Sequence, residues 1–269
     1  MFKIIRERLR QGQRTIAYPQ GPTPQTPDRF RGLPILDRAK CPDGCQECAE
    51  ACPTDAILCD EHSLRVDLGR CLFCNECQSA CPEGAVSYST EFRLATRERQ
   101  DLITDGRALL LARQLDEKTR RLFGRSFKLR VVSAGGCNAC EADVNVLSTV
   151  VFDLSRFGIQ YVASPRHADG LLITGPVTEN MKFALEQAYE AMPAPKIVIA
   201  VGACAISGGP YVGHEQVHNG ADSVVPVDLY VPGCPPHPLT ILDGLLRLLG
   251  RLEEPMFGLG GGLAPASKA

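Results

Sequence analysis

The sequence predicts a two-domain protein, in which a small cysteine-rich α+β domain precedes an α/β domain built on a parallel sheet. The length of 269 residues suits two domains of unequal size. Eight of the 13 cysteines lie in two dense runs between residues 41 and 81. After residue 128, short apolar runs alternate with stretches of helical periodicity, which is typical of a parallel sheet covered by helices.

The composition excludes several classes of protein. A hydrophobic content of 44% describes a globular chain and excludes disorder and a fibrous fold. No run approaches the roughly 18 apolar residues of a membrane-spanning helix, and the amino terminus lacks a secretory signal, so we expect a cytoplasmic protein. Disulfides do not persist in that compartment, so this many cysteines indicate metal ligands. Basic and acidic segments alternate, but no nucleic-acid-binding motif accompanies them, and we expect no nucleic-acid partner.

Residues 1–40 are predicted to form a basic amphipathic helix and a proline-rich linker. Over residues 1–14, Phe2, Ile5 and Leu9 recur at helical spacing among basic side chains. The prolines of residues 18–34 exclude a helix there and favour extended backbone. The helix either docks on a membrane surface or partner, or is simply solvated.

The segment of residues 41–90 carries two matching cysteine runs. The second, from Cys71 to Pro82, has the spacing C-x2-C-x2-C-x3-C-P of bacterial iron-sulfur proteins. The first, from Cys41 to Pro53, repeats it with one extra residue after the first cysteine. In paired runs the fourth cysteine of each binds the cluster of the other. The first predicted 4Fe-4S cluster is therefore assigned to Cys41, Cys45, Cys48 and Cys81. The second is assigned to Cys52, Cys71, Cys74 and Cys77.

Zinc is the alternative for these eight thiolates. Four-thiolate zinc sites use two close cysteine pairs, whereas these runs are triplets followed by a Cys-Pro step. The segment is too small for an independent core, so metal binding is expected to supply much of its folding energy.

Residues 91–127 are predicted to be a basic helical connector, with a helix from Glu91 to Phe123, because leucines recur among arginines there. In the following domain, residues 128–254, strands are expected at residues 129–133, 158–162, 170–174, 196–201 and 227–231. Helices are expected at residues 143–157, 179–191 and 238–252. Residues 255–269 are expected to be a flexible tail.

Four further cysteines each follow a predicted strand of this second domain. They are Cys137, Cys140, Cys204 and Cys234. Loops at the carboxyl ends of parallel strands converge on one crevice, and the neighbouring glycines allow close approach of the backbone to an inorganic group. We therefore expect a third 4Fe-4S cluster there. The alternatives are a thioredoxin-like redox pair at Cys137 and Cys140, a zinc site, or ordinary buried thiols.

Four other polar residues receive weaker assignments. Cys59, outside both runs, is expected to be a buried thiol. Glu141 lies at the start of a helix, where the helix dipole stabilises a carboxylate, and a place beside a proton path is the alternative. His214 and His218 are four residues apart, but the surrounding glycines indicate an interface loop rather than a metal-binding helix.

Both halves of the chain resemble known families. Residues 1–105, through Phe30-Arg31-Gly32, the cysteine runs and Glu91–Ala95, resemble the ferredoxin-like iron-sulfur subunit of formate hydrogenlyase and its counterpart in complex I. Residues 128–252, through residues 136–141, 202–209 and 226–236, resemble the small subunit of membrane-bound, energy-converting nickel-iron hydrogenases and the homologous 20 kDa subunit of complex I. Complex I enzymes typically carry adjacent cysteines where two residues separate Cys137 from Cys140, which favours the hydrogenase branch. His237 stands where relatives commonly carry arginine.

The resemblance implies an α+β two-cluster ferredoxin domain fused to a flavodoxin-like α/β domain, with three 4Fe-4S clusters in series and no catalytic centre of its own. It implies electron transfer to or from the hydrogenase-like large subunit of a complex on the cytoplasmic face of the cell membrane. The implied partners are that large subunit, of the nickel-iron or quinone-site type, the membrane subunits, and a formate dehydrogenase or ferredoxin as electron donor. The alternatives are the equivalent subunit of a complex I-like enzyme that reduces quinone, and a scaffold or stand-alone ferredoxin.

Overall fold

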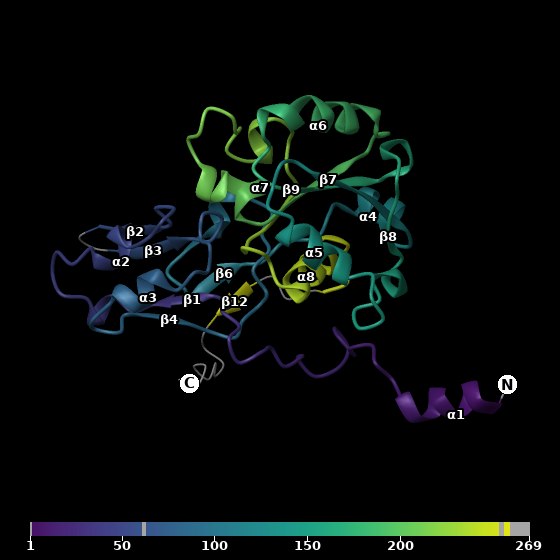
Figure 1. Cartoon of the computed structure of the whole chain (residues 1–269), viewed down its shortest axis with the longest axis horizontal. Coiled ribbons are helices and arrows are strands. Elements are labelled where there is room, and N and C mark those ends of the chain that lie inside the picture. The colour runs from purple at the N-terminus through teal and green to yellow at the C-terminus, as the bar shows by residue number, and fades with distance from the viewer. Residues whose placement is uncertain (1, 61–62, 253–255, 259–269) are drawn as a thin grey trace.

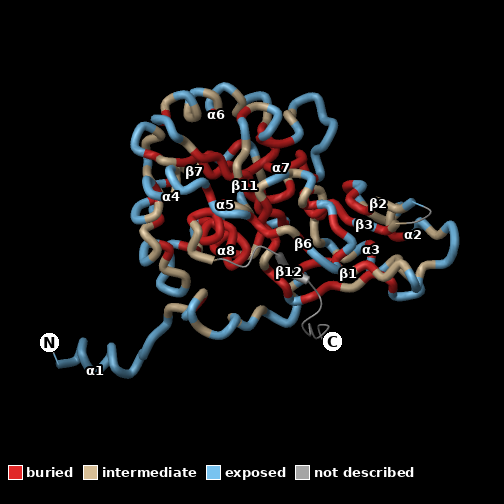
Figure 2. Tube along the Cα trace, turned by 180° about the vertical axis from the view of Figure 1, so that it is seen from behind, coloured by how far each residue is buried: buried red, intermediate tan, exposed pale blue. Residues whose placement is uncertain are grey.

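The computed structural model describes residues 2–60, 63–252 and 256–258 (Figure 1). It contains a cysteine-rich module, residues 34–110, and a sheet module, residues 127–248. Helix α1 (Phe2–Gln11) stands away from both, and none of its residues is buried (Figures 1 and 2). The predicted amphipathic helix is therefore present, with Phe2 and Leu9 88% and 78% exposed.

Short antiparallel strand pairs frame the cysteine runs. Strand β1 (Pro34–Leu36) pairs with β4 (Val86–Tyr88), and β2 (Ile57–Cys59) pairs with β3 (Leu64–Asp67). Each run contributes one short helix, α2 (Glu47–Glu50) or α3 (Glu76–Ala80), that carries the third cysteine of that run. A single turn of 3-10 helix, Arg38–Lys40, leads into the first run. This repeated arrangement is ferredoxin-like, as the cysteine spacing predicts.

The predicted helix from Glu91 to Phe123 is wrong over most of its length. A 3-10 turn (Arg99–Leu102) leads into β5 (Ile103–Thr104) and β6 (Ala108–Leu110), and only α4 (Glu117–Phe123) is helical. Most of the leucines that suggested a helix, such as Leu109, Leu111 and Leu115, are buried on mostly extended backbone.

A tight turn at Gly106 explains this difference. Gly106 has a φ of +82° and reverses the chain between β5 and β6, where the Thr104 hydroxyl donates to the Ala108 carbonyl at 2.7 Å. Strand β5 then pairs with β3, as the register Val66 to Thr104 shows. The segment thus extends the sheet of the cysteine-rich module.

A five-stranded parallel sheet in the order β11-β10-β9-β7-β8 forms the second module. The strands are β7 (Phe127–Ser133), β8 (Ile159–Tyr161), β9 (Gly170–Thr174), β10 (Ile197–Val201) and β11 (Leu229–Val231). Helix α6 (Glu179–Ala191) covers one face, and α5 (Ala139–Val146) and α8 (Pro238–Leu248) cover the other (Figure 1). This strand order is that of a flavodoxin-like fold, as predicted.

The bounds of several elements differ from those predicted. The helix expected at residues 143–157 is instead α5 and a separate 3-10 turn (Leu154–Phe157). Asn138, with a left-handed φ of +71°, precedes α5 and lets the helix begin early enough to include Cys140. The expected flexible tail, residues 255–269, lies outside the described residues, except that β12 (Met256–Gly258) pairs with β6.

The core of the sheet module is centred on α8, all eleven residues of which are buried. An ion pair inside this core joins Arg247 Nε to Asp243 Oδ2 at 2.8 Å. The Tyr18 hydroxyl donates to Asp243 Oδ1 at 2.5 Å. The proline-rich linker is thereby fixed to α8, because a buried carboxylate needs both partners.

Hydrogen bonds join the two modules. Thr96 and Tyr230 exchange two backbone hydrogen bonds of 3.0 and 2.9 Å along β11. Ser207, the last residue of α7 (Ala203–Ser207), donates from its hydroxyl to the Gly69 carbonyl at 2.9 Å. Among the helices of the described residues, none has the length and apolar character needed to cross a membrane.

Candidate metal centres

All 13 cysteines are free thiols, and twelve of them fall into three sets of four. The first thiol set surrounds the start of the first run. Burial raises the pKa of Cys41, which also interacts electrostatically with Cys81 and Cys45. The pKa of Cys48 is raised to about 11, mainly by burial and then by the neighbouring Cys41, Cys59 and Cys81. The structure therefore brings Cys81 of the second run to the first run.

The second thiol set gathers around Cys71. The pKa of Cys71 is raised to about 12, mainly by burial, and the neighbouring Cys77, Cys52 and Cys74 contribute to this rise. Cys52 belongs to the first run, so the two runs exchange their fourth cysteines in space. Burial is also the main cause of the raised pKa of Cys77, whose sulfur lies 3.5 Å from the Tyr88 hydroxyl.

Backbone amides are aimed at three of these sulfur atoms. Ala56 N donates to Cys52 Sγ and Ala85 N to Cys81 Sγ, both at 3.2 Å. Phe73 N donates to Cys71 Sγ at 3.3 Å from a loop in which Phe73 has a φ of +52°. Such donors stabilise negative charge on sulfur, which is the form that binds iron. The four-thiol sets with N–H donors fit iron-sulfur clusters.

The third thiol set lies at the carboxyl ends of the parallel strands. Cys137 and Cys140 follow β7, Cys204 lies in α7 after β10, and Cys234 follows β11. Burial raises the pKa of Cys140, which also interacts with Cys204, Cys234, Glu141 and Cys137. The four cysteines expected to share a crevice are therefore neighbours.

Two glycines leave room for the sulfur atoms of the third set. A Cβ on Gly202 would lie 2.6 Å from Cys140 Sγ, and one on Gly209 would lie 2.8 Å from Cys204 Sγ. Both distances are shorter than a carbon–sulfur contact permits. The backbone is thus shaped around these thiols, and the set offers four cysteine thiols, as the first two sets do.

The three sets follow one another through the molecule. Cys48 of the first set interacts electrostatically with Cys77 of the second. Cys234 of the third set interacts with Cys74 of the second, and both thiols are exposed. The second set therefore lies between the other two, where the modules meet.

The remaining candidates have structural partners. Glu141 is buried and accepts hydrogen bonds from the hydroxyls of Ser133 and Thr174, the latter at 2.7 Å. His218 Nε2 pairs with Glu179, and Cys59 Sγ is 3.6 Å from the Cys45 carbonyl oxygen. Across residues 2–60, 63–252 and 256–258, no three or more His, Cys, Asp or Glu side chains are placed to hold a single metal ion.

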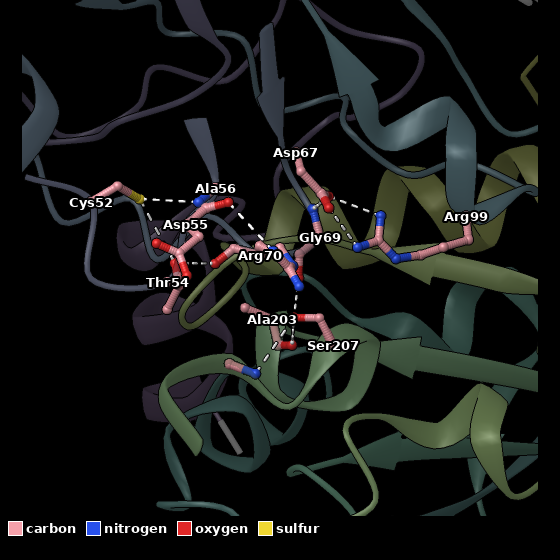
Figure 3. Close-up of polar contacts among 11 residues, drawn as sticks. Cys52, Thr54, Asp55, Ala56, Asp67, Gly69, Arg70, Arg99, Ala203 and Ser207 are labelled. Carbon is pink, nitrogen blue, oxygen red and sulfur yellow. Dashed lines mark hydrogen bonds and ion pairs between the residues drawn. The ribbon is translucent and has the colours of Figure 1, made fainter. Parts of the chain in front are cut away.

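The polar contacts around Gly69 have no counterpart among the motifs of the sequence. Asp67 Oδ1 accepts from Gly69 N at 2.9 Å and from Arg99 Nη1 at 2.8 Å, while Ser207 reaches the Gly69 carbonyl from the other module (Figure 3). Partners 138 residues apart in the chain share no local pattern. The close approach of Ser207 to Gly69 therefore becomes visible only in the folded structure.

Comparison with known proteins gives two family matches. Residues 137–248 match the family of the 20 kDa subunit of NADH ubiquinone oxidoreductase, and residues 40–85 match the 4Fe-4S dicluster domain. Formate hydrogenlyase subunit 7 of Escherichia coli is 46% identical over 138 residues, which cover 51% of this chain and 54% of that protein. The match thus spans about half of that relative.

Two other relatives are covered more fully. The probable membrane-bound hydrogenase subunit mbhJ of Pyrococcus furiosus is 41% identical over 138 residues, covering 51% of this chain and 83% of that protein. An NADH-quinone oxidoreductase subunit of Heliobacterium modesticaldum is 42% identical over 123 residues, covering 45% of this chain and 70% of that protein. Hydrogenase and quinone oxidoreductase subunits are thus both relatives.

Proposed function

Because this chain belongs to the family of the 20 kDa subunit of NADH ubiquinone oxidoreductase, we propose that it is an electron-transfer subunit of a membrane-associated nickel-iron hydrogenase complex. The complex is of the formate hydrogenlyase or energy-converting type. The chain relays electrons, through three 4Fe-4S clusters, to or from a large catalytic subunit. The observation that carries this proposal is the placement of three four-thiol sets in succession across two modules.

The residues of each set have distinct tasks in this proposal. Cys41, Cys45, Cys48 and Cys81 hold the first cluster, Cys52, Cys71, Cys74 and Cys77 the second, and Cys137, Cys140, Cys204 and Cys234 the third. When bound, such a cluster takes up and releases single electrons. The buried side chains around the first two sets exclude water, and amides such as Ala56 N stabilise thiolate charge.

The proposed partners follow from the same placement. The exposed Cys137 and Cys234 put the third set at the surface, where a hydrogenase-like large subunit would dock. The first set, at the opposite end of the series, would receive electrons from a formate dehydrogenase or a ferredoxin. Membrane subunits and α1 would hold the chain peripherally on the cytoplasmic face of the cell membrane.

A complex I-like enzyme that passes electrons to quinone is the second candidate. The 42% identity to an NADH-quinone oxidoreductase subunit supports it. The interval of two residues between Cys137 and Cys140 favours the hydrogenase branch. Nickel ligands in the large subunit that purifies with this chain would support the first candidate, and their absence would support the second.

Iron analysis of the anaerobically purified chain tests the proposal. Three 4Fe-4S clusters require about twelve iron atoms and about twelve sulfides per chain. The Cys204→Ser variant should retain about eight and keep the electron paramagnetic resonance signals of the first two clusters, while hydrogen-linked electron transfer is lost. The matched control is Cys59→Ser, which should retain all twelve because Cys59 belongs to no set. About eight iron atoms in the parent chain would remove the third cluster.

A further inference from the structure

The stretch that leads into Cys71 lies against the other module at a buried glycine, Gly69. A Cβ added to Gly69 would lie 2.7 Å from Ile206 Cγ2 and 2.8 Å from Arg99 Cζ. Gly69 does not adopt the left-handed backbone conformation, so its small size rather than its flexibility is what the site uses. Only glycine allows the Cys71 stretch to lie directly against α7.

Ser207 secures this contact. Its hydroxyl lies 2.9 Å from the Gly69 carbonyl oxygen and 3.1 Å from the Ala203 carbonyl oxygen, so it is shared between the two modules (Figure 3). Ala203 and Ser207 begin and end α7, which carries Cys204. Gly69 lies two residues before Cys71. A single hydroxyl therefore connects the backbone beside one ligand of the second set to the helix that carries a ligand of the third.

The cysteine-rich side of this contact is braced. The Asp67 carboxylate accepts hydrogen bonds from Nη1 and Nη2 of Arg99, at 2.8 and 2.7 Å, and from the Gly69 amide at 2.9 Å. The Asp67 carbonyl accepts the amides of Arg70 and Cys71 at 3.1 and 3.0 Å. A bidentate carboxylate–guanidinium pair has a fixed geometry, so residues 67–71 form a rigid loop.

The same loop is tied to Cys52. The Thr54 hydroxyl donates to the Arg70 carbonyl at 2.8 Å and lies 3.9 Å from Cys52 Sγ (Figure 3). Two proposed ligands of the second set, Cys52 from the first run and Cys71 from the second, are thus held by hydrogen bonds to the loop of residues 67–71, which Ser207 contacts. Displacing Ser207 would shift the second set as a unit relative to Cys204.

We propose that the Gly69–Ser207 contact is a clamp that sets the spacing between the second and third metal centres. Ser207 is a positioning residue for electron transfer between them, and Gly69 is the small residue that permits the short spacing. The inference rests on the proposed function and adds the residues that control the step between modules. Electron transfer depends steeply on separation, so a clamp at this junction affects the rate of the step between the second and third centres.

The test uses the full chain with its clusters, purified anaerobically and fully reduced. In the parent, magnetic interaction between the second and third clusters should split their electron paramagnetic resonance signals. Ser207→Ala should retain the parent iron content, narrow that splitting, and slow electron transfer between the two centres. The matched control is Ser89→Ala, because Ser89 is also buried and its hydroxyl donates to Leu33 O at 3.0 Å within the cysteine-rich side. It should leave the splitting unchanged.

A second pair of variants tests the clamp without removing a hydrogen bond. Gly69→Ala should narrow the splitting because its methyl group pushes against Ile206 and Arg99. The double variant Gly69→Ala/Ile206→Ala should restore part of it because the opposing Cγ2 is gone. Restoration would support a spacing role, since general loss of stability would be greater in the double variant.

Three results would count against the proposal in distinguishable ways. Splitting equal to the parent in both Ser207→Ala and Gly69→Ala would overturn the clamp. Loss of about four iron atoms from Ser207→Ala would show that Ser207 is needed to hold a cluster rather than to space two. About eight iron atoms in the parent would overturn the proposed function itself, whatever the variants do.

Discussion

His237 caps the N-terminus of α8, and its side chain can form the capping hydrogen bond only when the imidazole is neutral. Its Nδ1 accepts a hydrogen bond from Leu239 N at 3.1 Å, and a protonated imidazole has no lone pair to accept it. Burial lowers the pKa of His237, and the Phe30 ring packs edge-on at 5.2 Å. The adjacent cavity, about 220 Å³, also contains Arg29, Arg31 and Asp143. The cap is therefore sensitive to acid.

A pH series should reveal this cap. The pKa of His237 is lower in the folded chain than in the unfolded chain, where it is about 6.5. The capping hydrogen bond therefore stabilises the fold fully above about pH 6.5, and this stabilisation is lost as the pH falls below that value. Between about pH 7.5 and 5.5 we expect the first turn of α8 to lose about 1 kcal/mol. Hydrogen exchange of residues 237–249, corrected for intrinsic rates, measures it. His237→Asn, which caps at any pH, should lose no protection, and equal losses in both proteins would refute the assignment.

The spatial grouping of the cysteines was readily predicted, and their assignment as cluster ligands stays a prediction. Their spacing alone sorts Cys52 and Cys81 into opposite sets, because cluster binding imposes a fixed pattern on the chain. The convergence of Cys140, Cys204 and Cys234 followed from the rule that ligands bind at the carboxyl ends of parallel strands. Ser207 carries no such pattern, since its partner is defined by packing between modules.

Among the elements, strongly periodic segments were predicted best. Strand β9 and helix α6 have the bounds expected from sequence, because one is a continuous apolar run and the other an uninterrupted amphipathic stretch. The leucines of residues 91–123 led to a wrong prediction because consecutive apolar residues, such as Leu109, Leu110 and Leu111, do not by themselves distinguish a helix from a strand. The Asp105-Gly106 pair was the available signal for a turn.

The β5–β6 turn should be intolerant of substitution. In Gly106→Ala the added Cβ would lie 2.1 Å from the Pro34 carbonyl oxygen, and φ is +82°. We expect a loss of about 3 kcal/mol in the free energy of unfolding. Gly213→Ala is the control, because Gly213 has a similar φ of +78° with no atom within 4 Å. It should cost about 1 kcal/mol, and equal losses measured by denaturant titration would contradict a steric role for the turn.

Helix α1 presents an apolar stripe and basic side chains with nothing packed on them among the described residues. Deleting residues 1–14 should release the chain from the membrane fraction of cells, with the largest difference from the full chain at low salt. Each basic residue near an anionic surface contributes roughly 1 kcal/mol, so the attraction is weak and screened. A variant with Arg6, Arg8 and Arg10 changed to glutamine should show an intermediate loss. Retention of the truncated chain at every salt concentration would leave α1 without an anchoring role.

At the scale of the whole molecule, the two modules differ in what stabilises them. One apolar cluster surrounds α8 in the sheet module, whereas the cluster that includes the cysteines extends from residues such as Val66 of the cysteine-rich module to residues such as Leu171 of the sheet. Thiols with pKa values raised by burial resist ionisation, so without iron this module lacks the interaction that its ligands are arranged for.

Removing the iron should therefore loosen one module and spare the other. After anaerobic chelation we expect hydrogen exchange to increase at least about tenfold over residues 41–88, while β9 and β10 keep their protection. Mass spectrometry of the exchanged peptides makes the comparison within one sample. A uniform increase across both modules would instead indicate that they unfold as one unit.

The bridge between Thr96 and Tyr230 has a consequence for how the sheet module would behave alone. Strand β11 is the outermost strand of its sheet, and Thr96 occupies the hydrogen-bonding groups of Tyr230 that would otherwise face outward. An unpaired, apolar outer strand is a template for pairing with another chain. The cysteine-rich module thus protects the edge strand β11 from pairing with other copies of the chain. A chain truncated to begin at β7 would expose this edge and is expected to self-associate.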